Sequence, residues 1–447
     1  MKAETTPMPD PVPASKFESE LRDLTVRADE WIEAHADQFD PMNWGDIEQR
    51  SVRRKAFGES ALYLHVAERE GEPRAERLKQ LLIERSNDFE YQQLLARNPQ
   101  EVHKFGYPLV YASTHGELSD EAREMLHRTL DRQTVWATEL PPFRKLDLQH
   151  LARMYGYDVP YDTPDFDALV DQSCASYRLN PVEMTRREVY ALTHNFLFYH
   201  NFGNPGDGFP GDAVSYDHPE TLHGLLLRFI AADDCDLVGE LLYSAALQRQ
   251  LPPGLARFAL GWLLEQVADE GYVPSPADGL PISAVAESDG LTDLDMGTWD
   301  DESAKWGRHY HPTLVAASMG RILGEAWPEI DREENRRDLN YDEEAENLYE
   351  LGAVFDSLAD YDLRESADRL RDLADTPTAA AYPDVFEFAV EFLEAQQRPD
   401  GEFGFWTDEK RVYLSMDEDH DEESFAEQLL SPTTETCRET IDAIRDR

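Results

Sequence analysis

Two stretches of the sequence decide the fold: Phe258-Ala-Leu-Gly-Trp-Leu-Leu-Glu-Gln266-Val-Ala-Asp-Glu-Gly271-Tyr272 and Phe388-Ala-Val-Glu-Phe-Leu-Glu-Ala-Gln396-Gln-Arg-Pro-Asp-Gly401-Glu402. They align without a gap at a shift of 130 residues. Each predicts an amphipathic helix that ends in Gln, then a turn whose Gly accepts a positive φ. Such hairpins cannot bury their apolar faces alone, so they favour a stacked helical repeat. Alternatively, two amphipathic helices resemble each other by chance.

Helical spacing of apolar residues also extends along most of the chain. No alternating strand of useful length is found, and several prolines stand near expected helix starts, where a missing N–H costs little. The sequence therefore predicts an all-α protein with helices near 145–155, 165–176, 184–200, 219–232, 236–250, 253–268, 311–326, 343–373, 383–397 and 433–446.

Three regions are expected along the chain. Residues 1–15 hold four prolines and predict a mobile, disordered leader. Residues 16–140 predict an N-terminal helical region, and residues 141–447 predict a domain of helical hairpins. The aromatic that follows each repeated turn is Tyr272 in the first copy, and Phe403, Phe405 and Trp406 in the second.

The charge of the chain is strongly negative. Asp and Glu number 91 against 42 Lys and Arg, of which 8 are Lys, and the formal net charge is −49. Self-repulsion of this size is screened when salt shortens the Debye length to about 3 Å at 1 M. With 41 % hydrophobic residues available for a core, the composition predicts a folded halophilic protein, most simply from a haloarchaeon. A nucleic-acid mimic or histone-binding protein is the alternative.

Several classes of function are disfavoured. No basic stripe is present to neutralise phosphates, so binding to nucleic acid or to an anionic membrane is not expected. Cys174, Cys235 and Cys437 are far apart and form no CxxC pair. The sequence holds no run of about 18 apolar residues and no GxSxG, HExxH or Walker motif. We expect a soluble, cytoplasmic protein, and the sequence indicates no particular cofactor or oligomeric state.

The Gln-x4-Gly turn followed by an aromatic resembles the repeats of α/α-toroid proteins such as terpene cyclases, prenyltransferase β-subunits and lanthipeptide cyclases. The resemblance implies inner and outer helices around a central well that holds the site. The chain departs from these families in two respects: Asp293-Leu-Asp295 is not the DxDD motif of a squalene-type cyclase, and no Cys/His zinc cluster is evident.

A second resemblance covers about residues 145–446. Arg187-Glu-Val-Tyr190-Ala-Leu-Thr-His194-Asn-Phe-Leu-Phe-Tyr-His200, together with Tyr310-His311-Pro-Thr and Asp400-Gly401-Glu-Phe-Gly404, looks like an uncharacterised family of actinobacteria and haloarchaea. Members of that family occur near peptide natural-product genes, which implies an accessory or biosynthetic role. The resemblance carries over no catalytic residue.

The first candidate site is on the 184–200 helix. His194 and His200 are six residues apart and therefore point about 120° apart. Tyr190 stands one turn before His194 and presents a phenol beside the imidazole. Alternatively, His194 is a hydrogen-bonded core histidine and His200 a capping residue.

The second candidate is Asp236 with Glu240 one turn further on. Apolar neighbours surround both, so we expect desolvation to raise the pKa of Glu240, which suits a general acid or base. Alternatively, Asp234 or Asp236 is an N-cap favoured by the helix dipole.

The third candidate is Trp306-Gly-Arg308-His309-Tyr310-His311. We expect it at the mouth of a helix that starts near 311, where free N–H groups favour an anion or polar ligand. Structural packing is the alternative. A further alternative is a metal at His309 and His311, with a third ligand from Asp212, Asp217, His218 or the Asp293–Asp301 loop.

The segment 271–309 predicts a lid, a partner loop or a disordered connection. Two functions remain from the sequence. The first is a binding protein that holds a peptide or small ligand in a central well. Its ligand-binding residues are Tyr190, Asp236, Trp306, Arg308, His309, Tyr310 and Trp406. The second is an enzyme that uses His194, Glu240 and His311 as acid–base groups in the same well, provided that the three side chains converge.

Overall fold

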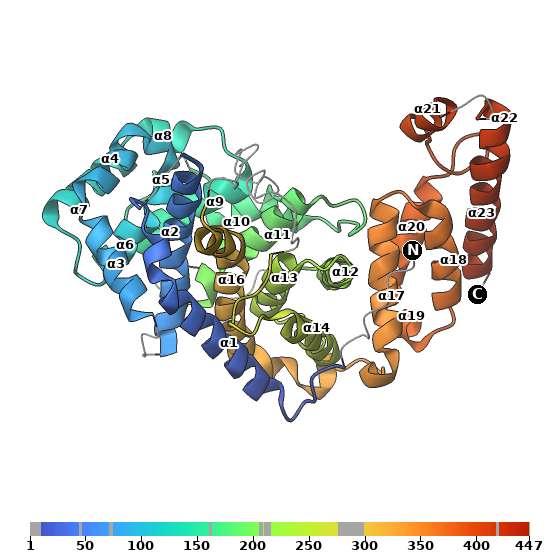
Figure 1. Cartoon of the computed structure of the whole chain (residues 1–447), viewed down its shortest axis with the longest axis horizontal. Helices are drawn as coiled ribbons and strands as arrows, with labels where there is room; N and C mark the ends of the chain where they lie inside the picture. Colours follow the sequence, from blue (N-terminus) through green and yellow to red (C-terminus); the bar gives the residue numbers. More distant parts are fainter. Residues whose placement is uncertain are drawn as a thin grey trace.

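The computed structural model describes residues 10–43, 47–70, 75–160, 163–204, 209, 216–275, 299–416 and 420–446. Across these residues the chain is helical, and the only extended pairing is an isolated bridge between Gln397 and Phe403. The predicted all-α class is confirmed (Figure 1). Within the same residues, no helix combines the length and the apolar character that crossing a bilayer requires.

The helices keep the labels of Figure 1. Their bounds are α1 Phe17–Ala34, α2 Ile47–Ala67, α3 Glu76–Ser86, α4 Phe89–Arg97, α5 Val102–Phe105, α6 Tyr107–Thr114, α7 Asp120–Leu130, α8 Gln133–Ala137, α9 Pro142–Tyr155, α10 Phe166–Asp171, α11 Arg186–Tyr199, α12 Pro219–Ala231, α13 Cys235–Gln248, α14 Pro253–Gln266, α16 Asp301–Ile330, α17 Tyr341–Ala359, α18 Leu363–Leu373, α19 Pro377–Ala381, α20 Pro383–Ala395, α21 Asp408–Leu414, α22 Glu422–Phe425 and α23 Ser431–Arg445.

Local sequence sets many of these boundaries. Helices α12, α14 and α20 begin with a proline at the first position, as the sequence indicates. Helix α11 begins with a capping box, in which Thr185 and Glu188 satisfy each other's backbone N–H groups. Helices α13 and α16 begin at the Asp caps Asp234 and Asp300.

The repeated stretches adopt the same turn. In the first copy Ala268 N donates to Tyr272 O, and in the second Arg398 N donates to Glu402 O. Gly271 and Gly401 both have positive φ values, of 94° and 85°. The predicted glycine turn after each helix is therefore confirmed, because only glycine adopts this conformation without strain.

Among the described helices, six form a ring of contacts around one cavity, and Tyr107 of α6 also lines it. Helix α2 packs against α16, α16 against α13, α13 against α11, α11 against α9, and α9 against α5, which returns to α2. Helix α1 packs against α16. The surrounding helices come from both sides of residue 140, so the predicted N-terminal region and the predicted domain share this cavity. An α/α-toroid with alternating inner and outer layers stays a prediction.

The C-terminal helices α17–α23 form the other side of the molecule (Figure 1). Helix α17 packs against α12 and α18, and α18 packs against α23. They approach the cavity helices mainly through α12.

Part of the predicted leader is ordered. Residues 1–9 lie outside the described residues, but Val12 is buried and its N–H donates to Arg257 O at 3.1 Å. Gly261 of α14 permits this approach, because a Cβ there would lie 2.6 Å from Asp10 O. Residues 10–12 therefore pack on α14 instead of extending freely.

Two predicted helix boundaries are wrong. Helix α16 starts at Asp301, ten residues before the expected 311, and encloses Pro312 in its interior. The expected 343–373 helix is two helices, α17 and α18, separated at Tyr361, whose φ is 67°. In both cases a polar cap, Asp300 or Asp362, starts the helix.

Candidate functional site

The helices around the centre enclose a cavity of about 370 Å³. A volume of this order accommodates a small organic molecule. Its lining is mixed, with ionisable, aromatic and aliphatic side chains: Arg50, Ser51, Arg54, Lys55, Gly58, Glu59, Leu62, Tyr63, Glu101, His103, Lys104, Phe105, Tyr107, Phe143, Arg144, Asp147, Arg187, Tyr190, His194, Leu197, Phe198, Phe202, Glu240, Tyr243, His311, Leu314, Val315 and Ser318.

One wall of the cavity carries a cluster of carboxylates around His311. His311 Nε2 lies 3.5 Å from Asp236 Oδ1 and 3.5 Å from Glu240 Oε1, and His311 Nδ1 lies 3.2 Å from Glu59 Oε2. Lys55 lies 3.4 Å from Glu59 on the same helix. Burial acts to lower the pKa of His311, but Glu59, Asp236 and Glu240 outweigh it and raise that pKa well above its usual range.

Two carboxylates of this cluster, Glu240 and Glu59, are stabilised as anions. Burial acts to raise the pKa of Glu240, but His194, His311 and Thr193 outweigh it and lower that pKa. The same competition lowers the pKa of Glu59, where Lys55 and His311 oppose the effect of burial. The prediction of a raised pKa for Glu240 is therefore wrong, because cationic neighbours were not visible from the apolar residues around it in sequence.

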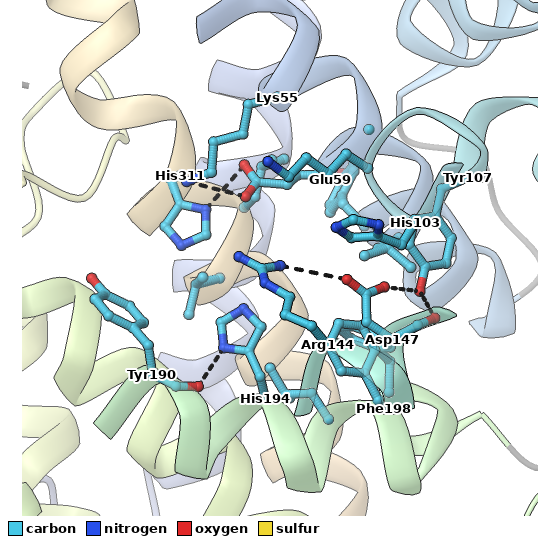
Figure 2. A pocket seen from close by; sticks show the side chains of 18 of the residues that line it. Lys55, Glu59, His103, Tyr107, Arg144, Asp147, Tyr190, His194, Phe198 and His311 are labelled. Atoms are coloured by element: carbon cyan, nitrogen blue, oxygen red, sulfur yellow. Dashed lines mark hydrogen bonds and ion pairs between the residues drawn. The ribbon is translucent and has the colours of Figure 1, made fainter. Parts of the chain in front are cut away.

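His194 presents one ring nitrogen to the cavity. Its Nδ1 lies 2.7 Å from Tyr190 O and 3.6 Å from Glu240 Oε2. The hydrogen-bond network thus assigns the proton to Nδ1 and leaves Nε2 as an acceptor. Burial, Arg144 and His311 lower the pKa of His194 against the opposing effect of Glu240. The side chain points into the cavity opposite His311 (Figure 2).

A second group of ionisable side chains lies on α9. Arg144 Nη1 lies 3.4 Å from Asp147 Oδ2, and Tyr107 donates to Asp147 Oδ1 at 2.7 Å. Figure 2 shows the Arg144 guanidinium extending between His194 and the Glu59 wall. The α9 arginine thus lies next to the α11 histidine within one cavity.

Helix α2 contributes a third group, which is cationic. Arg50 and Arg54 are one turn apart and both line the cavity. Desolvation and the charge of Arg50 lower the pKa of Arg54. Arg54 Nε is buried without a hydrogen-bond partner, and Arg54 makes no ion pair with a described residue. Like charges at this spacing repel each other.

The structure brings together four of the sequence-predicted site residues at the cavity: Tyr190, His194, Glu240 and His311. Asp236 lies directly behind them, where it accepts a hydrogen bond from Tyr190 and contacts His311. The three predicted acid–base residues, from α11, α13 and α16, therefore converge.

The other predicted ligand-binding residues lie elsewhere. Trp306 and Tyr310 are buried and stack on each other with ring centroids 5.1 Å apart, and Arg308 is exposed. Trp406 packs against Tyr361 in the C-terminal helices. The predicted helix mouth at 306–311 does not exist, because these residues lie inside α16, where the backbone N–H groups are already engaged in the helix.

The predicted pairing of His309 with His311 is not observed. His309 stacks on Tyr272 at 4.5 Å and accepts from Ser275 N, whereas His311 points toward Asp236 and Glu240. Alternate residues of a helix point about 200° apart, which places the two imidazoles on different faces. Of the proposed third ligands, His218 contacts Glu220 at the start of α12. Asp212 lies outside the described residues. So do residues 276–298, which make up most of the predicted lid and include 293–298 of the proposed ligand loop.

The structure also tests the structural roles that the sequence offered for Asp234 and His200. Asp234 caps α13 by accepting from Leu237 N, as its N-cap interpretation predicts. His200 is the C-terminal cap residue of α11, and its Nε2 lies 2.8 Å from Gln248 Nε2. The three cysteines are free thiols, in agreement with the absence of a disulfide pattern.

Sequence reasoning missed the contributions of α2 and α9. Glu59, Arg54 and Arg50 of α2 line the cavity, as do Arg144 and Asp147 of α9. One signal was present: the segment 50–55 holds four of the chain's 42 basic residues. Such a concentration in a strongly acidic chain indicates a local role for positive charge.

Comparison with known proteins gives one match. No curated protein and no solved structure matches the chain. A family model described as a domain of unknown function, DUF6895, matches residues 25–321. This range contains every residue that lines the cavity, from Arg50 to Ser318, and ends before α17. The chain therefore belongs to the DUF6895 family.

Proposed function

We propose that the chain binds a small anionic organic molecule in its central cavity. The observation that supports this is the charge of the lining. Six Lys and Arg side chains line the cavity against four Asp and Glu, whereas over the whole chain acids outnumber bases by 91 to 42. A cavity that reverses the charge balance of its protein attracts anions, and low-dielectric walls strengthen that attraction.

Arg54 is the main anion contact in this proposal. Its buried Nε lacks a partner among the described residues, and Arg50 stands one turn away. A carboxylate or phosphate between the two guanidinium groups relieves their repulsion and accepts hydrogen bonds in bidentate geometry.

The apolar side chains of the lining indicate the character of the part of the ligand that carries no charge. Aromatic and aliphatic side chains occupy the same cavity as the cations, among them Phe143, Leu197, Phe198 and Leu314. A ligand with an anionic head and an apolar body satisfies both groups. A short peptide that carries a free carboxylate is one such ligand, and it agrees with an accessory role in a peptide natural-product pathway.

Native mass spectrometry of the full-length chain tests this proposal. We expect the wild-type chain to retain one anionic ligand per chain after purification or after addition of a dicarboxylate series. The variant R54Q is expected to lose that ligand. R411Q is the matched control, because Arg411 is 77 % exposed and lies in α21, away from the cavity. A ligand that is neutral, or that R54Q retains as well as R411Q does, would contradict the proposal.

A second candidate is an enzyme that transforms the same ligand. It is favoured by the convergence of His194, Glu240 and His311, with His194 Nε2 open to the cavity as a proton acceptor. We expect the wild-type chain to convert its captured ligand and H194Q to bind it unchanged. Equal conversion by the wild-type chain and H194Q would exclude His194 as the base. Recovery of unchanged ligand from the wild-type chain would contradict the enzyme candidate and support binding without catalysis.

A further inference from the structure

Three side chains on the His311 wall each direct one polar atom at a common point. These atoms are Asp236 Oδ1, Glu240 Oε1 and His311 Nε2, and they lie within 4.8 Å of one another. Asp236 is 2 % exposed, and its Oδ1 accepts no hydrogen bond from a described residue. A buried carboxylate oxygen without a hydrogen-bond donor is costly, and the cation it contacts is the His311 imidazole, whose Nε2 lies 3.5 Å away. A metal ion that takes the place of the Nε2 proton would satisfy this oxygen more closely than the imidazole does.

The other polar atom of each side chain is already held. Asp236 Oδ2 accepts from the Tyr190 hydroxyl, and Glu240 Oε2 accepts from the Thr193 hydroxyl. His311 Nδ1 contacts Glu59 Oε2 at 3.2 Å. Metal-binding histidines and carboxylates are oriented by such outer partners, and a carboxylate on the far nitrogen of the imidazole is typical of them.

The spacing agrees with coordination of a small divalent ion. Ligands at about 2.0–2.1 Å from a tetrahedral zinc ion are about 3.3 Å from one another. The His311 Nε2 distances to Asp236 Oδ1 and Glu240 Oε1 are both 3.5 Å. The spacing therefore requires movements of only a few tenths of an ångström in these two pairs.

We propose that Asp236, Glu240 and His311 bind one divalent transition-metal ion, with Glu59 orienting His311. An imidazole among the ligands favours Zn²⁺ or a neighbouring transition metal over Mg²⁺ and Ca²⁺, which prefer oxygen ligands. Three protein ligands leave an open coordination position, and Glu240 and His311 line the cavity on that side. The site does not depend on the identity of the anionic ligand.

Metal binding gives Glu240 and His311 a different role. In the acid–base candidate, Glu240 and His311 exchange protons with the ligand. As metal ligands they are fixed, and His194, which lies 3.6 Å from Glu240 and contacts Tyr190 O, remains beside the open position. An ion bound there would supply Lewis-acid polarisation of a carbonyl or phosphoryl oxygen of a ligand in the cavity.

Metal titration of the chelator-treated, full-length chain tests the site. Isothermal titration with Zn²⁺ is expected to show one tight site per chain with release of protons. The Co²⁺ form is expected to show visible absorption bands typical of four or five ligands. H311Q is expected to abolish both signals, and E59Q to weaken binding by about 10- to 100-fold, as outer-partner variants do.

The matched control is H127Q, because His127 is 58 % exposed and also pairs with an aspartate, Asp131. H127Q is expected to bind Zn²⁺ as the wild-type chain does. E240Q is a second ligand variant, and the circular dichroism melting of each variant confirms that it is folded. Absence of a tight site in the wild-type chain overturns the inference. Equal binding by H311Q, E240Q and H127Q overturns it too, because it indicates ions held only by the acidic surface.

Discussion

Buried ionisable side chains link α1 to two of the helices that line the cavity, α2 and α16. Asp29 of α1 is 1 % exposed, accepts from Tyr63 of α2 at 2.8 Å and pairs with Arg321 of α16 at 2.6 Å. This triad ties α1 and α2 to α16 just beyond the His311 cluster. Because every member is hydrogen-bonded, the arrangement fixes how these helices pack, but it makes each member hard to remove.

Replacing Asp29 tests this link. D29N is expected to lower the free energy of unfolding by about 3–5 kcal/mol, because Arg321 stays buried without its counter-ion. The control E124Q breaks an exposed pair in which Arg128 is 71 % and Glu124 is 64 % exposed. It is expected to cost less than about 1 kcal/mol. Denaturant unfolding measures both, and equal effects would show that the Asp29 triad contributes no more than a surface pair.

Desolvation favours the neutral form of four histidines, of which His150 and His223 are fully buried. Burial lowers the pKa of His65, His200 and His223 to about 4, and that of His150 to about 3. The unfolded chain protonates histidine near pH 6.5, whereas the folded chain does not until lower pH. The stability that these groups contribute is therefore complete above pH 6.5 and is lost as the pH falls from 6.5 toward 4.

His223 allows a single-residue test of this pH dependence. Its Nε2 lies 2.7 Å from Gln250 O, Tyr382 packs against the ring, and Arg337 is the charged neighbour that lowers its pKa further. H223Q retains a side-chain N–H at a similar position but does not titrate. Between pH 4.5 and 6, the free energy of unfolding of the wild-type chain falls with decreasing pH, in part because the unfolded state binds a proton at His223. In H223Q this dependence is expected to be smaller by about 1.4 kcal/mol per pH unit, the contribution of one proton. Unchanged slope in denaturant unfolding would contradict the neutral state of His223.

At the scale of elements, glycines set how closely helices approach. Gly352 of α17 faces α12, where a Cβ would overlap Leu227 O and come within 2.6 Å of Leu227 C. This contact joins the C-terminal helices to those around the cavity. On α16, Gly324 has open space around its Cα.

Alanine at these two positions gives opposite expectations. G352A is expected to destabilise the chain by about 1–3 kcal/mol, because backbone atoms of α12 must move. G324A is expected to stabilise it by up to about 1 kcal/mol, because alanine is the better helix former and nothing obstructs it. Thermal and denaturant unfolding measure the pair, and a neutral G352A would show that α17 does not pack closely on α12.

Helix type and much of helix placement could be predicted from the sequence, because apolar spacing and proline positions are local signals. The α16 start could not, because Pro312 imitates a helix start while the true cap is Asp300. For the site, His194, Glu240 and His311 could be predicted from the sequence, because their side chains are suited to acid–base chemistry. The partners Glu59 and Arg144 were missed, because only tertiary packing brings α2 and α9 to the same cavity.

At the scale of the whole molecule, the chain carries a net charge of −49, whereas basic side chains outnumber acidic ones in the lining of the cavity. Surface carboxylates repel one another over a Debye length of about 10 Å at 0.1 M salt and about 3 Å at 1 M. The cations in the cavity are screened much less, because salt reaches them poorly. A halophilic habitat stays a prediction of the composition.

Salt is therefore expected to stabilise the fold. The free energy of unfolding is expected to rise between 0.1 and about 1 M KCl as screening removes self-repulsion. Sucrose at matched osmolality separates screening from general exclusion of solute from the surface. A free energy that is unchanged by KCl, or that sucrose raises equally, would contradict the role of self-repulsion.

The most direct test of the central claim is anomalous diffraction from crystals of the wild-type chain grown with bromide as the anion. The account predicts a bromide peak in the cavity beside Arg54, since Arg54 Nε is buried there without a hydrogen-bond partner among the described residues and cations outnumber acids in the lining. R54Q crystals provide the control and are expected to lose that peak. Bromide on surface arginines alone, with none in the wild-type cavity, would contradict the claim that the cavity is an anion-binding site.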